Sequence, residues 1–217
     1  ARGRAIQLGL EPARVYVTGM PVAWRFCLPP ADRVELRTRL GWPQDQPVIL
    51  LVGGGEGMGP LMATALAIDA AQLPAALVVV TGRNQRARQQ LENHTWHIPH
   101  RLYGFTGQMP EMMQAADILV TKAGPGTISE AFIAGLPLVL FSRMPGQEDG
   151  NVTYVENGGA GVWAPGPDRV TAVLRRWLEF PAERQQAAEC SLRLATPQAT
   201  SQTARLLAEL VLQVHRL

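Results

Sequence analysis

The chain has 217 residues, of which 47% are hydrophobic, so it can bury a full core, and its length fits one large domain over residues 1–217 better than two small ones. Its 20 basic and 18 acidic side chains leave a net charge of +2, and no basic run is interleaved with aromatic residues, which argues against a nucleic-acid partner. No run approaches the ~18 apolar residues that a spanning helix needs, and no segment has the pattern of a secretory signal, so we expect a soluble chain.

Two further features indicate a cytosol-facing piece of a longer protein. Cys27 and Cys190 lie far apart, with no CxxC pair or Cys/His cluster nearby, which is typical of reduced thiols in the cytosol. The sequence opens at Ala1 with ARGRAIQLGLEP, a pattern typical of the tail of a helix. We therefore expect this chain to be part of a longer protein; a genuine mature N-terminus is the alternative.

Runs rich in Val, Ile and Leu alternate with helical patterns along the chain. Runs that are apolar at every position are typical of parallel strands that helices cover on both faces. They predict an α/β fold with a doubly wound, Rossmann-like parallel sheet. The six predicted strands are VYVT at 15–18, VILLV at 48–52, ALVVVT at 76–81, RLYGF at 101–105, DILVT at 117–121 and PLVLF at 137–141.

Capping residues predict where two of the helices begin. Asp32 with Glu35 three residues later forms a capping-box pattern, and Gly41 is placed to end that helix. Thr127 with Glu130 repeats the pattern before AFIAGLP.

From Pro167 onward the strand patterns stop and three helical segments follow, over 171–180, 182–195 and 200–217. The last segment is amphipathic, and its apolar face could pack on this domain's own sheet or, equally well, on a missing partner domain. That face carries Leu206, Leu207, Leu210, Val211 and Val214.

Glycine and polar residues follow four successive predicted strands. In a doubly wound sheet, ligands bind beyond the carboxyl ends of the strands. Glycine lets backbone N–H groups approach a phosphate, and the next helix N-terminus adds unpaired donors and partial positive charge. One such turn would be ordinary in this fold, but four on one edge predict a diphosphate site. The candidate residues are Gly53, Gly54, Gly55, Gly57, Gly59, Gly104, Phe105, Thr106, Lys122, Gly124, Gly126 and Thr127.

The familiar phosphate and metal patterns are missing from the sequence. GGGEGMG has no Lys-Ser or Lys-Thr after it, as a P-loop would, and it does not match GxGxxG followed by an acid after the next strand. There is no Asp-x-Asp pair, and we find no His/Asp/Glu cluster at metal-ligand spacing. We therefore expect no metal and no cofactor, with ligand charge met by backbone dipoles or by a cation of the protein.

Lysine occurs only once, at position 122, whereas the other 19 basic residues are arginine. A compact ammonium and a planar guanidinium differ most where space is tight. We infer that Lys122 offsets phosphate charge or orders the Gly-Pro-Gly turn that follows it. Chance placement is the alternative.

The loop Gly-Gln-Glu-Asp-Gly-Asn at 146–151 follows the last predicted strand. Amide and carboxylate groups clustered in this way can recognise a ring of sugar hydroxyls, and Gln147, Glu148 and Asn151 are the candidates. Polar residues at the start of a helix would give the same pattern.

Four motifs in this order resemble a known family. They are GGGEGMGP at 53–60, TKAGPGTISEA at 121–131, GLP at 135–137 and GQExGNV at 146–152. Together they are similar to the monogalactosyldiacylglycerol synthases, which belong with the processive diacylglycerol glycosyltransferases and a lipid-linked N-acetylglucosaminyltransferase in glycosyltransferase family 28. The resemblance runs from about Val15 to about Val162.

The resemblance implies the C-terminal, donor-binding half of a GT-B glycosyltransferase, with the N-terminal acceptor domain absent from this chain. It places the glycines of 53–59 along the donor diphosphate, Phe105 and its loop against the uracil, and Glu130 under the ribose hydroxyls. It places Gln147 and Glu148 at the hexose. The general base, the lipid-binding surface and the membrane contact are expected in the missing domain, so no catalytic residue is expected here.

The expected reaction is inverting transfer of a hexose from UDP, preferably galactose, to the hydroxyl of diacylglycerol, by a protein that is cytoplasmic and peripheral at the membrane. UDP-glucose is an alternative donor. A UDP-sugar epimerase of the same architecture is an alternative enzyme, although it would need catalytic acids and a base in this half. As an isolated fragment, the chain is expected to bind nucleotide without turnover.

Overall fold

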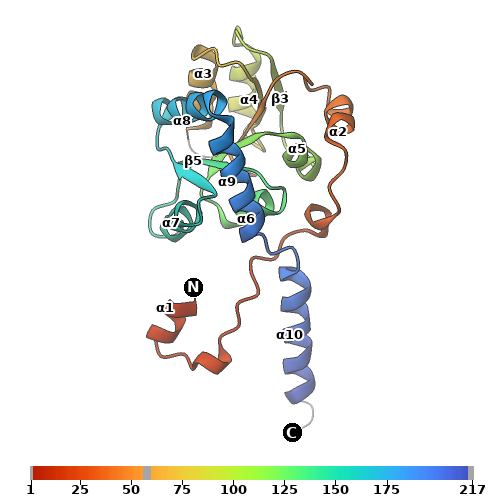
Figure 1. Cartoon of the computed structure of the whole chain (residues 1–217), viewed down its shortest axis with the longest axis vertical. Coiled ribbons are helices and arrows are strands. Elements are labelled where there is room, and N and C mark those ends of the chain that lie inside the picture. Colours follow the sequence, from red (N-terminus) through yellow and green to blue (C-terminus); the bar gives the residue numbers. More distant parts are fainter. Residues whose placement is uncertain (1, 56–59, 215–217) are drawn as a thin grey trace.

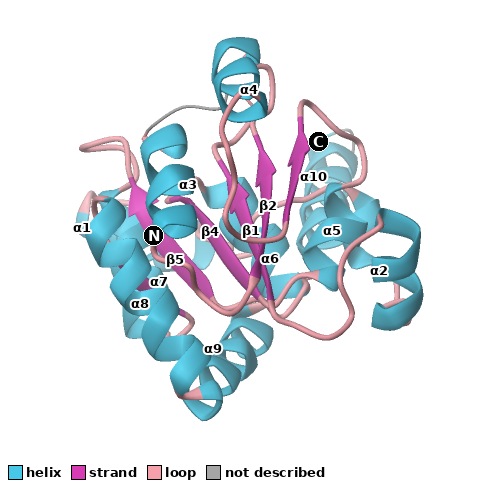
Figure 2. Cartoon of the chain, turned by 90° about the horizontal axis from the view of Figure 1, so that it is seen from above, coloured by secondary structure: helices cyan, strands magenta, loops and turns pink. Residues whose placement is uncertain are grey.

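The computed structural model describes residues 2–55 and 60–214, within which six parallel strands form a sheet in the order β3-β2-β1-β4-β5-β6. Figure 2 shows this sheet between layers of helices. The predicted α/β, doubly wound fold is therefore confirmed. The strands are β1 (Val48–Val52), β2 (Ala76–Val80), β3 (His100–Tyr103), β4 (Ile118–Lys122), β5 (Leu138–Ser142) and β6 (Gly161–Trp163).

Two layers of helices cover the sheet. Packed on one face are α3 (Leu61–Ala70), α4 (Gln85–Glu92) and α8 (Pro167–Glu179). Packed on the other are α2 (Arg33–Leu40), α5 (Met109–Ala115), α6 (Pro125–Ile133) and α7 (Asp149–Asn157), while α9 (Pro181–Leu194) contributes a residue to each core.

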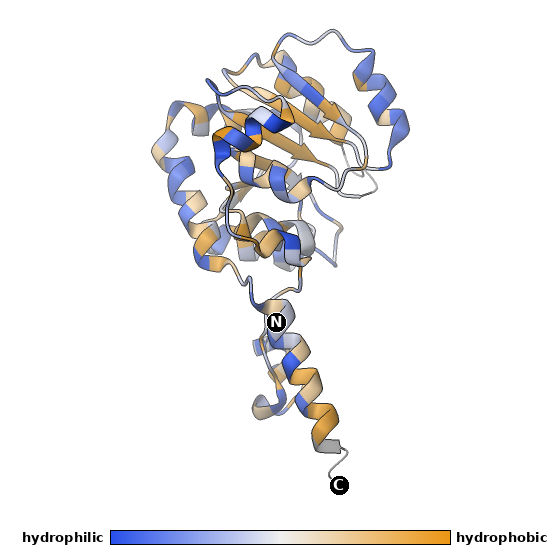
Figure 3. Ribbon diagram, turned by 90° about the vertical axis from the view of Figure 1, so that its right-hand side faces the viewer, coloured by the Kyte–Doolittle hydropathy of each residue, from blue (hydrophilic) through white to orange (hydrophobic). Residues whose placement is uncertain are grey.

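The central strand β1 shows why the sheet is buried on both sides. Val48, Leu50 and Val52 belong to one core, whereas Ile49 and Leu51 belong to the other. All five are at most 5% exposed. A strand that is apolar at every position thus fills two cores at once, as Figure 3 shows for the strands enclosed by helices.

Five of the six strand predictions are confirmed to within a few residues, and one is wrong. The segment at 15–18 forms no strand, and its Tyr16 and Val17 side chains are 62% and 69% exposed. Its apolar residues fit a strand, but the segment lies away from the sheet and has no strand beside it to pair with. The strand β6 was not predicted, because three residues carry too little pattern.

The two capping predictions have opposite outcomes. The first is confirmed, because the Asp32 carboxylate accepts the N–H of Glu35 at 2.9 Å and Gly41 ends α2 in the left-handed region, with φ 66°. The second is wrong, because α6 begins at Pro125, with Gly124 as its N-cap and no side-chain cap. Proline is favoured in the first helical turn, so it starts the helix two residues before Thr127.

The ends of the chain extend away from the sheet. Figure 1 shows α1 (Arg2–Gln7) and α10 (Ala199–Val214) on the same side of the body, and Thr203 Oγ1 donates to Thr18 Oγ1 at 2.9 Å near the base of α10. Leu207, Leu210 and Val211 are 51% to 58% exposed, so the interpretation that this helix packs on its own sheet is wrong.

None of the helices described has both the length and the apolar content to cross a bilayer. Both cysteines are free thiols, as predicted.

Asp117, directly before β4, ties α2 to the sheet. Its carboxylate pairs with Arg37 Nη2 at 2.5 Å and with Arg33 Nη2 at 2.6 Å, and it accepts the backbone N–H of Val48 at 2.6 Å. The side chains of Arg37 and Asp117 are only 8% and 13% exposed. Two elements far apart in sequence are thus joined through one largely buried carboxylate.

We expect Asp117→Asn to lower the free energy of unfolding by about 3 kcal/mol, because it leaves a buried guanidinium without its counter-charge. Urea unfolding followed by circular dichroism measures this loss. The matched control is Glu183→Gln, which breaks the exposed Arg176–Glu183 pair (2.6 Å) and should leave the midpoint unchanged. A loss below about 1 kcal/mol for Asp117→Asn would show that the pair does not hold α2 in place.

Candidate donor-binding site

The candidate site lies where the winding of the sheet reverses. From β1 the chain continues through α3 to β2, whereas from β4 it continues through α6, on the opposite face, to β5. Val52 pairs with Thr121, so Gly53 and Lys122 leave adjacent strands at the same edge. Open α/β sheets bind ligands at such a switch point, because the loops diverge there.

The glycine loops after β1 and β2 contact each other. The N–H of Arg83 donates to the carbonyl of Gly55 at 2.9 Å, and Gly53 donates to Val80 at 3.5 Å. Gly82 has φ 60°, and a Cβ there would meet the carbonyl oxygens of Gly54 and Gly55. Glycine is therefore required at position 82 for both conformation and space. The predicted site residues Gly57 and Gly59 lie outside the residues that the structure describes.

Lys122 occupies the centre of this edge. Its Nζ lies 2.6 Å from Glu148 Oε1, and the other oxygen of Glu148 accepts the N–H of Met144 at 2.8 Å. The side chains of Lys122 and Glu148 are 28% and 5% exposed. The buried carboxylate thus holds the ammonium in place and leaves part of it open to solvent.

Two glycines leave room for the Lys122 side chain. A Cβ at Gly54, which has φ 76°, would lie 3.3 Å from Lys122 Cε, and a Cβ at Gly124 would lie 3.0 Å from Nζ. A register shift between Thr121 and Lys122 in the pairing with β5 accompanies this placement. The side chain therefore runs between the loops that follow β1 and β4, where a guanidinium would have less space.

The start of α6 supplies backbone donors at the same edge. The first intrahelical bond joins the N–H of Ile128 to the carbonyl of Gly124, so the N–H groups of Gly126 and Thr127 precede it. Such groups lack intrahelical acceptors and carry the positive end of the helix dipole. An anion held there would be favoured by both the helix and Lys122.

In the loop at 146–151, two of the candidate residues form hydrogen bonds to neighbouring elements and the third is exposed to solvent. Asn151 Nδ2 donates to the carbonyl of Ala123 at 2.8 Å, which ties α7 to the loop after β4. Glu148 is the N-cap residue of α7 and is engaged by Lys122. Gln147 is exposed. Sequence reasoning found all three residues but did not predict that Glu148 pairs with Lys122.

Phe105 lies at the far side of the edge, after β3. Its side chain is 66% exposed and so does not belong to the core, and the Arg83 guanidinium lies 4.8 Å from the ring centroid. Gly104 and Phe105 border a cavity of about 480 Å³ with Gly82 and Arg83. Thr106 Oγ1 accepts the N–H of Gln108 at 3.1 Å. An exposed ring beside a glycine-lined hollow can stack on a flat ligand.

Glu130 lies in α6, one turn beyond Gly126. Burial raises the pKa of its carboxyl above the ordinary 4.5. No hydrogen bond or ion pair from another described residue offsets that cost at its side chain. A carboxylate in such a position is free to accept hydrogen bonds from a ligand's hydroxyl groups.

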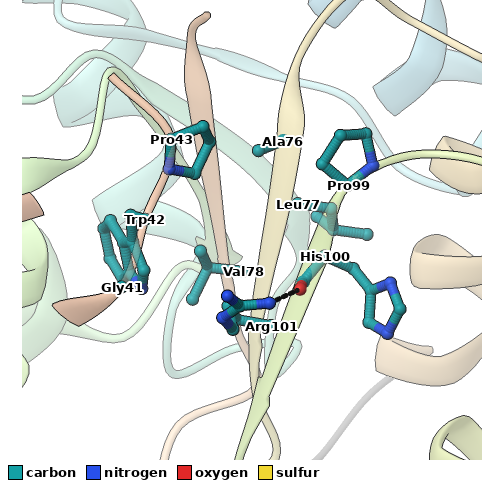
Figure 4. Close-up of a pocket in the computed structure, with 9 residues that line it drawn as sticks. All are labelled: Gly41, Trp42, Pro43, Ala76, Leu77, Val78, Pro99, His100 and Arg101. Carbon is teal, nitrogen blue, oxygen red and sulfur yellow. Dashed lines mark hydrogen bonds between the residues drawn. The ribbon is translucent and has the colours of Figure 1, made fainter. Parts of the chain in front are cut away.

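At the opposite edge of the sheet lie two features in which none of the predicted site residues takes part. A cavity of about 480 Å³ lies at the amino ends of β2 and β3, lined by Trp42, Val78, Arg101 and their neighbours (Figure 4). Near that edge, the structure groups Asp69 with His94 and His97. The sequence analysis found no His/Asp/Glu cluster at metal-ligand spacing, because Asp69 is 25 and 28 residues away from the two histidines and only the fold brings the three together.

Comparison with known sequences places the chain in a family. The sequence pattern of the glycosyltransferase family 28 C-terminal domain matches residues 48–202. A probable monogalactosyldiacylglycerol synthase 2, chloroplastic, of Oryza sativa subsp. indica is 42% identical over 204 residues, which are 90% of this chain and 44% of that protein. Monogalactosyldiacylglycerol synthase 1, chloroplastic, of Arabidopsis thaliana is 39% identical over 217 residues, covering 96% and 40%. The chain thus spans less than half the length of these relatives.

Solved structures share the fold. The UDP-GlcNAc 2-epimerase from Neisseria meningitidis bound to UDP-GlcNAc gives a TM-score of 0.69 at 15% identity, covering 96% of this chain and 58% of that one. MurG of Acinetobacter baumannii gives 0.63 at 22% identity, covering 84% and 55%. At these identities the likeness concerns the fold alone, which is the Rossmann-like fold of GT-B glycosyltransferases. Since the family pattern covers well over half of its residues, the chain belongs to the glycosyltransferase family 28 C-terminal domain family.

Proposed function

We propose that this chain binds a UDP-hexose, preferably UDP-galactose, and serves inverting transfer of the hexose to the hydroxyl of diacylglycerol in a longer protein. The observation that carries this proposal is the position of Lys122, held by Glu148 beside the start of α6 at the switch point of the sheet. The names of the relatives at about 40% identity support the lipid product.

The proposed chemistry depends on the charge that develops on the departing UDP. Lys122 and the first N–H groups of α6 are fixed before the ligand arrives, so they can stabilise that charge without reorganisation. Glu148 keeps Lys122 oriented while its own carboxylate stays buried. This arrangement supplies a protein cation where other enzymes use a metal. The general base would come from a part of the protein outside this chain.

The remaining residues take the roles that the family resemblance implies. Gly53, Gly54 and Gly55 would lie along the diphosphate, Phe105 would stack on the uracil, and Glu130 would accept hydrogen bonds from the ribose hydroxyls. Gln147 is exposed and suits contact with the hexose. Both oxygens of Glu148 are already engaged, one by Lys122 and one by the N–H of Met144, so Glu148 would contact the hexose only by sharing one of these oxygens.

Three other interpretations differ from this proposal in measurable ways. UDP-glucose would replace UDP-galactose if the loop at 146–151 accepts an equatorial hydroxyl at the position that distinguishes the two sugars. An epimerase of this fold would need catalytic acids and a base in this half. An isolated domain would bind nucleotide and transfer nothing.

We propose a membrane-peripheral location for the whole protein, with this domain on the cytosolic side.

Isothermal titration calorimetry of the chain with UDP tests the proposal. We expect one UDP per chain, tighter binding of UDP than of ADP, and the same affinity with EDTA present, because no metal is needed. Incubation with UDP-galactose and diacylglycerol should give no product, because the base is elsewhere. An affinity for UDP no higher than that for ADP would contradict the donor site, and appreciable transfer would contradict the assignment of the base to another part of the protein.

The variant Lys122→Arg sharpens this titration. A guanidinium keeps the charge but is larger than an ammonium and has less room between Gly54 and Gly124, so we expect UDP affinity to fall about tenfold, or about 1.4 kcal/mol. The matched control is Arg175→Lys on the exposed surface of α8, which should leave the affinity unchanged. Equal UDP affinity for Lys122→Arg and the wild type would show that Lys122 is not part of the UDP site.

We expect Glu130→Gln to weaken UDP binding by about tenfold while leaving the fold as stable as the wild type, or more stable, at pH 7. Because the pKa of Glu130 is raised in the folded chain, the wild type loses stability as the pH rises through 4.5, and glutamine lacks that loss. In urea unfolding, the variant should therefore have the higher free energy of unfolding at pH 7, and the two proteins should differ little near pH 4. Unchanged UDP affinity would show that this carboxylate serves no ligand.

A further inference from the structure

A cluster of Asp69, His94 and His97 lies away from the candidate donor site. Asp69 is in the last turn of α3, and the two histidines lie in the connection from α4 to β3, near the amino ends of β2 and β3 (Figure 1). His94 Nε2 lies 2.9 Å from Asp69 Oδ2, and His97 Nδ1 lies 2.8 Å from the same oxygen. All three donor atoms are within 4.8 Å of one another.

The carboxylate of Asp69 is fixed by its surroundings. Its side chain is 1% exposed, and Oδ1 accepts the backbone N–H groups of His97 at 2.8 Å and Ile98 at 3.2 Å. Two backbone N–H groups thus hold Oδ1 in place, and Oδ2 is directed at both imidazoles.

The two imidazoles are oriented as well. Trp96 packs edge-on against His94 at 5.1 Å between ring centroids, and its Nε1 donates to the carbonyl of Leu91 at 3.0 Å. The side chains of His94 and His97 are 29% and 53% exposed, so an ion can reach them from solvent. The third histidine of the segment, His100, stacks on Trp96 at 4.5 Å and takes no part in the cluster.

We propose that Asp69, His94 and His97 form a binding site for a divalent transition metal ion of the zinc class. Two imidazole nitrogens and one carboxylate oxygen are a donor set that zinc accepts, at about 2.0–2.2 Å from each ligand atom, with water in a fourth position. His94 Nε2 and His97 Nδ1, the ring nitrogens that face Asp69 Oδ2, would have to carry no hydrogen in order to bind the ion. In the neutral rings the hydrogen would then lie on the other nitrogen, and the ion would lie between the three groups.

The site would act on the fold rather than on the donor. It joins the end of α3 to the segment that leads into β3, at the amino edge of the sheet, whereas Lys122 and the glycine loops lie at the carboxyl edge. An ion that binds only the folded chain raises its stability by mass action. The inference is independent of the proposed function.

The test is titration of the tag-free chain with Zn²⁺ by calorimetry, with Co²⁺ absorption as a second probe. We expect one ion per chain, visible absorption bands of cobalt in a tetrahedral site, and an unfolding midpoint that rises by several degrees with Zn²⁺. His94→Ala and His97→Ala should each weaken Zn²⁺ binding at least tenfold, since each removes one ligand.

The matched control is His100→Ala, which removes a histidine three residues from His97 and should leave Zn²⁺ affinity unchanged. Circular dichroism of the two ligand variants confirms that they are folded, and the doubly substituted chain must lose the cobalt bands. The proposal is overturned if the wild type takes up no Zn²⁺ at millimolar concentration, or if the double variant binds it as tightly as the wild type. UDP affinity measured on the same variants should not change.

Discussion

The adjacency of β1 and β4 in a parallel sheet is the constraint from which the candidate site follows. These strands are side by side, yet the chain leaves them toward opposite faces, so the loops after Val52 and Lys122 separate and leave room between them. Burial on both faces of the sheet stabilises this arrangement, since β1 is apolar at every position and fills both cores. The glycines at the strand ends then determine what can approach the opening.

Within that opening, the ion pair of Lys122 and Glu148 connects the two sides of the site. The carboxylate comes from the start of α7 and the ammonium from the end of β4, and Gly54 and Gly124 flank the methylene stem and the ammonium. A partly exposed cation, fixed by a buried partner and set beside a helix N-terminus, is suited to a diphosphate. Glu130 in the same helix carries a half-buried carboxylate that costs stability, as binding residues often do.

The sequence predicted the parts of this molecule that depend on local pattern. Five strands, the cap at Asp32 and the glycine-rich strand ends could be found because burial on both faces, capping and turns leave marks within a few residues. The segment at 15–18 has the composition of a strand but lies away from the sheet, and α6 starts at Pro125 rather than at Thr127. The pairing of Lys122 with Glu148 and of Asp69 with two histidines spans about 25 residues each, so only the fold brings these groups together.

The central claim is that this edge of the sheet holds the diphosphate of a UDP-sugar, and a crystal structure of the chain with UDP tests it most directly. The account predicts phosphate oxygens within hydrogen-bond distance of Lys122 Nζ and of the N–H groups of Gly126 and Thr127, with the uracil beside Phe105. A diphosphate bound at any other edge, or one whose oxygens contact neither Lys122 nor the start of α6, would contradict it.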